Sequence, residues 1–310
     1  MKKVFCLILL ATALIALVSC GGISTQNNTT NITMQDRAGN TIAVPEKIEK
    51  IIVMSPSIAE TLIDLGLSDK IIGIDKYSAY LTNLKSDLPQ FDLMTPDTEK
   101  LITLKPDIVF MTAMSAVNGV NPFQPLIDVG ICVASIPASN SIDGIKQDID
   151  FLGKVTSTED KANAIISNME SEIAKVKNIG DTITDKKKVY FEIAAAPELY
   201  SFGKDVFLDE MLNIIGLANV LSDQNSWIPV SEETVLNANP DIIFTNVNYL
   251  PNDPVEEIKS RSGWQNISAV KNNQVFYIDN NQTSHSNEYI VTALKEMAKD
   301  AYPEKYSDLK

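Results

Sequence analysis

Two glutamates occupy equivalent places in two similar segments of the 310-residue chain. Glu99 and Glu233 each stand seven residues before a Pro-Asp pair that ends a short helical stretch and is followed by an apolar strand. Asp97 and Ser231 are the expected N-caps, which places each carboxylate near the second helical position. A carboxylate there stabilises its helix by about 0.3–1 kcal/mol. Because that role does not require repetition at equivalent places, the repetition indicates a further function.

Other chemistry-bearing residues are scarce. The single histidine, His285, excludes metal sites built from several histidines and leaves little room for a Ser-His or Cys-His hydrolase. The sequence has no Gly-x-Ser-x-Gly motif and no phosphate-binding loop. Its formal net charge is −14, which disfavours nucleic acid as a partner because phosphate neutralisation needs Lys and Arg. We therefore expect neither enzymatic activity nor nucleic-acid binding.

The same α/β plan occurs twice around these residues. In each copy a short apolar run, typical of a buried parallel strand, leads to a helical segment that stops at a glycine. The strands are expected over 51–54 and 189–193, and the helices over 58–65 and 207–215. Gly66 and Gly216 stand where a left-handed residue commonly ends a helix. Two copies in the same order predict two similar α/β lobes.

Residues 159–179 separate the two copies and carry apolar side chains at helical spacing. A helix of about 20 residues spans about 30 Å. Such a helix either packs on one lobe or crosses between lobes, and its place between the repeats favours the crossing. We predict an N-terminal α/β lobe over 33–155, a connecting helix over 156–182 and a C-terminal α/β lobe over 183–310.

The N-terminus has the pattern of an export signal. Lys2 and Lys3 precede an uncharged apolar run over 4–18, which is too short to span a membrane and ends in small residues. We predict a signal peptide over 1–19. The protein should therefore act outside the cytoplasm.

The signal ends in Leu-Val-Ser-Cys at Cys20, which resembles the lipobox of bacterial lipoproteins. In such proteins the cysteine is lipidated and becomes the new N-terminus. The alternative is an ordinary signal in which Cys20 is incidental. We predict a lipidated, flexible tether over 20–32 that anchors the protein to the bacterial cell membrane.

The ordered set of motifs resembles the helical-backbone class of ABC-importer substrate-binding proteins, which bind cobalamin, ferric siderophores and haem. The resemblance covers about residues 33–305. The segments that carry it are 36–45, 50–57, 104–107 and 263–271. It implies two Rossmann-like α/β lobes joined by one long rigid helix, with a ligand cleft between the lobes at the carboxyl ends of the strands. We expect a monomer.

The resemblance also assigns a partner. In that family one glutamate of each lobe docks onto arginine pockets of a dimeric permease, and Glu99 and Glu233 align with that pair. It thus implies that these residues dock onto the permease dimer of an ABC transporter, which works with an ATPase.

Aromatic and polar side chains on loops after the strands are the candidate ligand contacts. Large flat aromatics suit a corrin, a porphyrin or an aryl siderophore, although scaffold packing is the alternative. Tyr77 and Trp227 align with aromatic cleft residues of cobalamin-binding members. His285, in the polar loop 280–287, either coordinates a cobalt or iron centre axially or is a surface histidine. The candidates are Tyr77, Tyr80, Trp227, Tyr200, Asn246, Tyr249 and His285.

The positions of the arginines and the single histidine limit the classes of ligand that we expect. Arg37 and Arg261 are the two arginines, and neither lies on a predicted cleft loop, which weakens an oxyanion or an acidic siderophore. The missing histidine cluster weakens free zinc or manganese. We expect a metal that arrives chelated, as a corrinoid, a ferric siderophore or haem, and no cofactor of the protein's own. The alternatives are a chelatase-like extracytoplasmic enzyme, a ferric-ion or oxyanion binder, and a structural lipoprotein.

Overall fold

The computed structural model describes residues 31–112, 115 and 120–309. The predicted signal peptide, Cys20 and most of the predicted tether lie outside the described residues. The first strands, β1 (Asn31–Gln35) and β2 (Thr41–Pro45), form an antiparallel hairpin. The hairpin therefore includes residues 31 and 32, which lie before the predicted boundary at 33. Among the helices described, none is long and apolar enough to cross a membrane.

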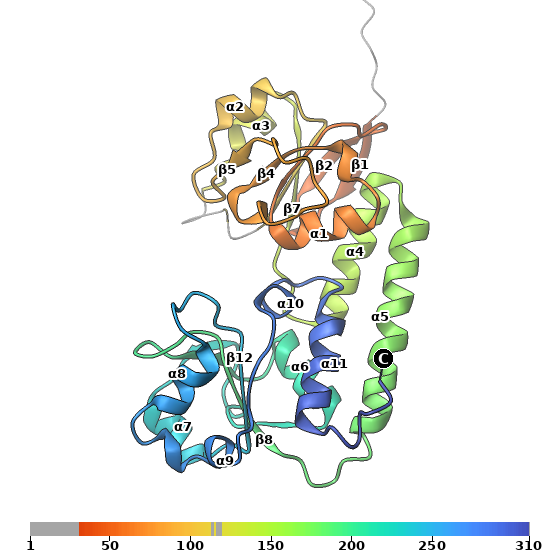
Figure 1. The fold of residues 1–310 in the computed structure, drawn as a ribbon. Helices are drawn as coiled ribbons and strands as arrows, with labels where there is room; N and C mark the ends of the chain where they lie inside the picture. The colour runs from red at the N-terminus through yellow and green to blue at the C-terminus, as the bar shows by residue number, and fades with distance from the viewer. Residues whose placement is uncertain (1–30, 113–114, 116–119, 310) are drawn as a thin grey trace, which may run out of the picture.

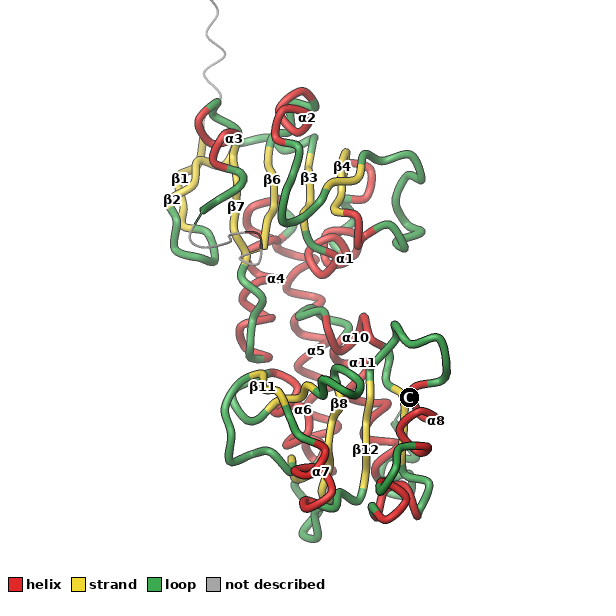
Figure 2. Tube along the Cα trace, turned by 90° about the vertical axis from the view of Figure 1, so that its left-hand side faces the viewer, coloured by secondary structure: helices red, strands yellow, loops and turns green. Residues whose placement is uncertain are grey.

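A five-stranded parallel sheet forms the centre of the N-terminal lobe (Figure 2). Its strands are β3 (Ile51–Met54), β4 (Ile71–Asp75), β5 (Gln90–Phe91), β6 (Ile108–Thr112) and β7 (Cys132–Ile136). They lie in the order β5-β4-β3-β6-β7. Every residue of β3, β6 and β7 is buried, as expected of strands covered on both faces. The helices are α1 (Pro56–Asp64), α2 (Thr98–Thr103) and α3 (Gln124–Asp128), with short 3₁₀ turns at Ser68–Lys70 and Lys76–Ser78.

The C-terminal lobe repeats the plan with a four-stranded parallel sheet, in the order β10-β8-β12-β13. These strands are β8 (Lys188–Glu192), β10 (Ala218–Asn219), β12 (Ile242–Thr245) and β13 (Val275–Tyr277). A separate antiparallel pair consists of β9 (Tyr200–Phe202) and β11 (Trp227–Pro229). The helices are α6 (Phe207–Ile215), α7 (Glu232–Ala238), α8 (Pro254–Ser260), α9 (Ser268–Lys271), α10 (Asn280–Ser284) and α11 (Ile290–Ala301), with a 3₁₀ turn at Trp264–Asn266. The prediction of two α/β lobes is confirmed.

Two long helices, lying side by side, bridge the lobes (Figure 1). The second, α5 (Glu159–Gly180), coincides with the helix expected over 159–179. The first, α4 (Ile142–Thr156), was not anticipated as part of the bridge. It begins beside the C-terminal lobe, where its Ile142 backbone N–H donates to Glu210 Oε2 on α6 (2.9 Å). The helices pack closely, since a Cβ added at Gly153 would lie 2.5 Å from the Ala162 Cβ.

The apolar core follows this architecture. One cluster of buried side chains runs from the N-terminal sheet through α4 and α5 to the C-terminal sheet. A second cluster lies on the other face of the N-terminal sheet and a third on the other face of the C-terminal sheet. Burial on both sheet faces explains why the strands read as continuous apolar runs. The helix ends also match expectation: Gly66 has φ +80° and Gly216 has φ +87°.

Candidate ligand-binding site

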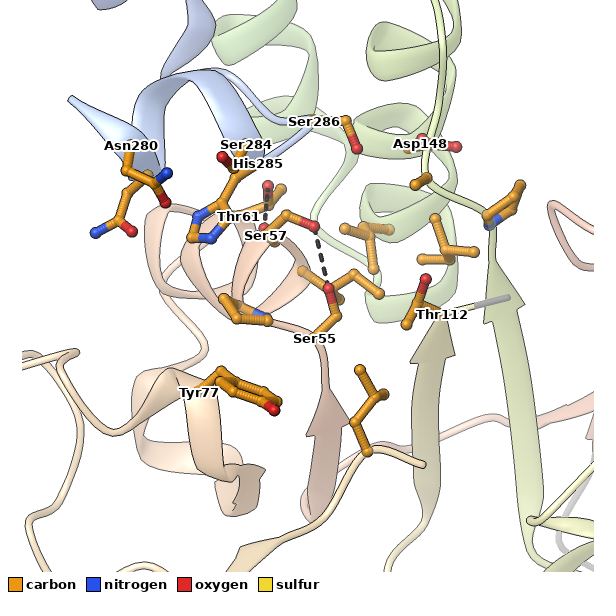
Figure 3. A pocket seen from close by; sticks show the side chains of 18 of the residues that line it. Ser55, Ser57, Thr61, Tyr77, Thr112, Asp148, Asn280, Ser284, His285 and Ser286 are labelled. Carbon is orange, nitrogen blue, oxygen red and sulfur yellow. Dashed lines mark hydrogen bonds between the residues drawn. The ribbon is translucent and has the colours of Figure 1, made fainter. Parts of the chain in front are cut away.

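A cavity of about 530 Å³ lies between the lobes, and residues of both lobes line it. Most of its N-terminal wall comes from the last residues of β6 and β7 and from segments that follow β3, β4, β5 and β7. The carboxyl ends of parallel strands meet at one sheet edge, which is where α/β folds bind ligands. Figure 3 shows Tyr77 on one side of the cavity and His285 on the other, with Ser55 and Ser57 between them.

Tyr77 and Tyr80 form the aromatic part of the N-terminal wall. Both follow β4, whose last residue, Asp75, accepts a hydrogen bond from the Tyr77 backbone N–H (2.8 Å) and another from the Ser78 hydroxyl. Burial raises the pKa of Asp75, against the opposing effect of these hydrogen bonds. The Tyr77 side chain remains 60% exposed. The Tyr77 ring therefore borders the cavity, and the hydrogen bonds to Asp75 fix the backbone that carries it.

Polar side chains lie at the base of the cavity. Ser55 and Ser57 flank Pro56 at the start of α1, and their hydroxyl oxygens lie 3.1 Å apart. Thr112 ends β6 and also lines the cavity. These three residues were not among the predicted contacts. The available signal was their place directly after or at the end of a buried strand.

The C-terminal wall comes from the segment after β13, for which the sequence predicted a polar loop. Residues 280–284 instead form α10, because Asp279 caps it by accepting from the Gln282 backbone N–H (3.1 Å). Ser284 and His285 at its end line the cavity, as do the unpredicted Asn280 and Asn281.

Asn246 lies beneath α10 and is 1% exposed. Its Nδ2 donates to Thr283 Oγ1 (3.0 Å) and Ser284 Oγ (3.3 Å), and its backbone oxygen accepts from Asn280 Nδ2 (2.8 Å). The predicted contact residue thus positions α10 and does not line the cavity.

The other predicted contacts of the C-terminal lobe do not line this cavity. Trp227 packs edge-on against Phe202 and Phe207, with ring centroids 5.8 and 6.3 Å away. Tyr200 donates weakly to the Trp227 backbone oxygen (3.3 Å), and the Tyr249 hydroxyl accepts from the Ala195 backbone N–H (2.9 Å). The structure therefore brings together Tyr77, Tyr80 and His285 but not these three, whose contact with ligand stays a prediction.

Beside the cavity, α1 is hydrogen-bonded to the chain between α10 and α11. Thr61 donates to Glu288 Oε2 (2.7 Å), and Tyr289 donates to Asp64 Oδ2 (3.0 Å). Glu60 accepts from Asn287 Nδ2 (2.6 Å) and lies 2.8 Å from His285 Nδ1. These contacts join the two lobes at the surface of α1.

Glu288 makes this junction sensitive to pH. Burial, and to a lesser extent the nearby Asp64 carboxylate, raise the pKa of Glu288 from 4.5 to about 8, against the hydrogen bond from Thr61. Its Oε1 is buried without a hydrogen-bond partner among the described residues. A carboxyl with a raised folded-state pKa favours the folded state below its unfolded pKa, and that contribution is lost as pH rises to the folded value.

The melting temperature should therefore fall as pH rises from about 4.5 to about 8, and Glu288→Gln should remove part of that fall. The glutamine keeps the shape but does not ionise. Thermal unfolding followed by circular dichroism across this range checks the prediction. The other titratable groups at the junction remain unchanged in the variant; they are Glu60, Asp64, Tyr80, His285 and Tyr289. Parallel pH profiles for the two proteins would contradict it.

Glu99 and Glu233 occupy the expected helical positions. Asp97 accepts from the Lys100 backbone N–H (3.0 Å) and Ser231 from that of Thr234 (3.1 Å), so each glutamate is the second residue of its helix. Both are exposed, and neither carboxylate forms a salt bridge or hydrogen bond with a described residue. Their helices, α2 and α7, lie on the side of the two lobes away from α5 (Figure 1).

Across the described part of the chain, no group of three or more His, Cys, Asp or Glu side chains could hold a metal ion. Both arginines are paired with carboxylates, and the partner of Arg37, Asp148, lines the cavity. Arg37 donates to Asp148 (2.6 Å), and Arg261 is buried against Glu192 (2.6 and 2.8 Å). No Lys or Arg is among the described residues that line the cavity.

Residues 51–282 match the family described as periplasmic binding protein. The chain belongs to this family. The match includes both sheets and all but the last residues of the cavity wall, which confirms the family resemblance found in the sequence. Like other periplasmic binding proteins, the chain acts outside the cytoplasm.

Three similar proteins show the range of the family. The ABC transporter substrate-binding lipoprotein YvrC of Bacillus subtilis is 27% identical over 309 residues, covering 96% of this chain and 97% of its own. The cobalamin-binding protein of Halobacterium salinarum is 24% identical over 275 residues, covering 86% and 73%. The molybdate-bound MolA of Haemophilus influenzae has the same fold (TM-score 0.77, 20% identity, 90% and 94% coverage).

Proposed function

We propose that this chain captures a chelated metal compound outside the cytoplasm and delivers it to the permease of an ABC importer. The compound is a corrinoid, a ferric siderophore or haem, bound without chemical change. Cys20 carries a lipid that holds the protein on the cell membrane. Family membership supports the transport role, and the similarity to a cobalamin-binding protein and to a lipoprotein supports the ligand class and the anchor.

The residues that line the cavity support this class of ligand. Exposed aromatic rings and mostly uncharged polar side chains line it. The one carboxylate of the described wall, Asp148, is paired with Arg37, and no described lining residue is a lysine or an arginine. A multiply anionic ligand would lose its hydration there without a compensating cation. A bulky ligand with delocalised or internally neutralised charge instead gains from burial against Tyr77.

A small oxyanion is the second candidate, because one observation favours it. The N-terminus of α1 meets the cavity with Ser55 and Ser57 beside it. Free backbone N–H groups at a helix start attract anions. MolA shows that this fold can hold molybdate. The missing lysines and arginines in the described wall are the reason for ranking this candidate below a chelate.

Tyr77→Ala should weaken binding of the chelate about tenfold, or about 1.4 kcal/mol, because it removes the most exposed aromatic ring of the cavity wall. Isothermal titration with a corrinoid, haemin and a ferric siderophore measures this, with molybdate as a separate arm. Tyr277→Ala is the matched control, since Tyr277 is 39% exposed but does not line the cavity.

The control variant should bind as the unaltered protein does. Tight binding of molybdate and of none of the chelates would identify a small oxyanion, and not a metal chelate, as the ligand. If the Tyr77 and Tyr277 variants bound the chelate equally well, the chelate would bind outside this cavity.

A further inference from the structure

One imidazole at the cavity is held by a carboxylate of the opposite lobe. His285 follows α10 in the C-terminal lobe, and its Nδ1 lies 2.8 Å from Oε2 of Glu60 on α1 in the N-terminal lobe. Glu60 is buried, whereas His285 lines the cavity. Figure 3 shows the ring of His285 extending from α10 towards the side that carries Tyr77.

The partners of Glu60 determine how the imidazole is oriented. Its Oε1 accepts from the Tyr80 hydroxyl (2.5 Å), and its Oε2 accepts from Asn287 Nδ2 (2.6 Å). Because both carboxylate oxygens act as acceptors in these contacts, we assign the proton of the pair to Nδ1 of His285, which then donates to Glu60 Oε2. A neutral imidazole with its proton on Nδ1 carries a lone pair on Nε2.

Nε2 is left for a ligand. No described residue hydrogen-bonds to it. Tyr80 also flanks the ring, with centroids 6.4 Å apart and planes 29° apart, so the ring is restrained on its face as well as through Nδ1. A histidine that donates its other ring N–H to a carboxylate is the usual arrangement of a metal ligand, since the carboxylate fixes the tautomer and makes the free nitrogen more basic.

We propose that Nε2 of His285 binds the metal centre of the captured compound, with Glu60 as the residue that positions it. This inference rests on the proposed function and narrows the ligand to a planar tetrapyrrole whose metal has an exchangeable axial position. The lone pair of Nε2 displaces a metal-bound water, so one metal–oxygen bond breaks and one metal–nitrogen bond forms. No electron is transferred, and the water leaves unchanged.

This chemistry separates the candidate ligands. A ferric siderophore that supplies six donor atoms leaves no position for the imidazole. A cobalt corrinoid or an iron porphyrin has four equatorial nitrogens and opens an axial position when water is the ligand there. Selection by an exchangeable axial position therefore favours tetrapyrroles over closed chelates of similar bulk.

Absorption spectroscopy of the full-length protein tests the proposal. Diaquacobinamide and haemin are the two probes, and dicyanocobinamide, whose axial positions are filled by cyanide, is the matched ligand control. The unaltered protein should shift the visible bands of diaquacobinamide, haemin or both, and leave those of dicyanocobinamide unchanged. A shift with only one of the two probes identifies the source as a corrinoid or a haem.

Two variants separate coordination from packing. His285→Ala should lose the shift, and imidazole added at a concentration that leaves the spectrum of the free probe unchanged should restore it, which a merely structural role would not produce. Glu60→Gln should weaken binding of the shifted probe by about 10- to 100-fold, the usual cost of losing an orienting partner of a metal ligand. Unchanged binding of dicyanocobinamide would show that both variants retain a folded cavity.

Binding of a probe with an unshifted spectrum, or the same shift in His285→Ala, would overturn metal ligation and leave the proposed function standing. Failure of the unaltered protein to bind any of the three compounds would also overturn the inference, and binding of a ferric siderophore instead would leave the proposed function standing.

Discussion

Replacing Glu99 and Glu233 together by alanine should lower uptake of the ligand more than tenfold and leave its affinity for the isolated protein within about twofold. Both carboxylates are exposed and lie outside the cavity wall, so their loss does not disturb the binding site. Removing one partner of a charge pair that becomes buried at an interface costs about 2–5 kcal/mol. One such pair on each lobe suits a permease with two equivalent subunits.

Uptake by cells that carry the permease, compared with titration of the purified variant, measures the two quantities separately. Asp160→Ala is the matched control. Asp160 is an exposed acidic residue at the second position of α5, so it shares the helix-dipole contribution of the two glutamates but lies on the bridge, away from α2 and α7. The control should transport normally. Normal uptake by the Glu99/Glu233 variant would refute the docking role.

Arg261→Met should destabilise the protein by about 3–5 kcal/mol, because it leaves a buried carboxylate without its partner. The Arg261 guanidinium donates to both oxygens of Glu192 and to Glu257, and it stacks on Trp264 at 4.5 Å. Glu192 is 1% exposed. Burial raises the pKa of Glu192, and the hydrogen bonds from Arg261 act in the opposite direction. The charged form of Glu192 therefore depends on this arginine.

Denaturant unfolding measures the loss in free energy. Lys154→Met, which breaks the exposed ion pair with Asp150, is the control and should change stability by no more than about 1 kcal/mol. Adding Glu192→Gln to Arg261→Met should recover part of the loss, because the uncompensated charge is then gone. Similar free energies of unfolding for the Arg261 and Lys154 variants would show that the buried pair contributes little.

Local signals were enough to predict the repeated elements. The apolar run of β3, the helix of α6 and the caps of α2 and α7 depend on residues within a few positions of one another, so sequence order contains the information. The crossing role of α4 could not be found this way. Its amphipathic pattern fits packing on either lobe, and the contact that places its start beside α6 joins residues 68 positions apart.

Local sequence signals also predicted only part of the cavity wall. Tyr77, Tyr80 and His285 were found because they follow strands, but the pairing of Glu60 with His285 joins residues 225 positions apart. Nothing local to Glu60 distinguishes it from other acidic residues on helices. Asn246 was chosen for its place after β12, yet tertiary packing of α10 covers it. Strand-exit position thus predicted the neighbourhood of the site, and long-range packing decided which side chains reach it.

The protein should bind one intact metal chelate between its lobes and should not convert it. Native mass spectrometry of the purified protein, incubated with a corrinoid, haemin, a ferric siderophore and molybdate, tests this most directly. We expect one chelate per protein, released on unfolding with its mass unchanged. Binding of molybdate alone, no bound compound from this set, or a released compound of altered mass would contradict the capture of an intact chelate.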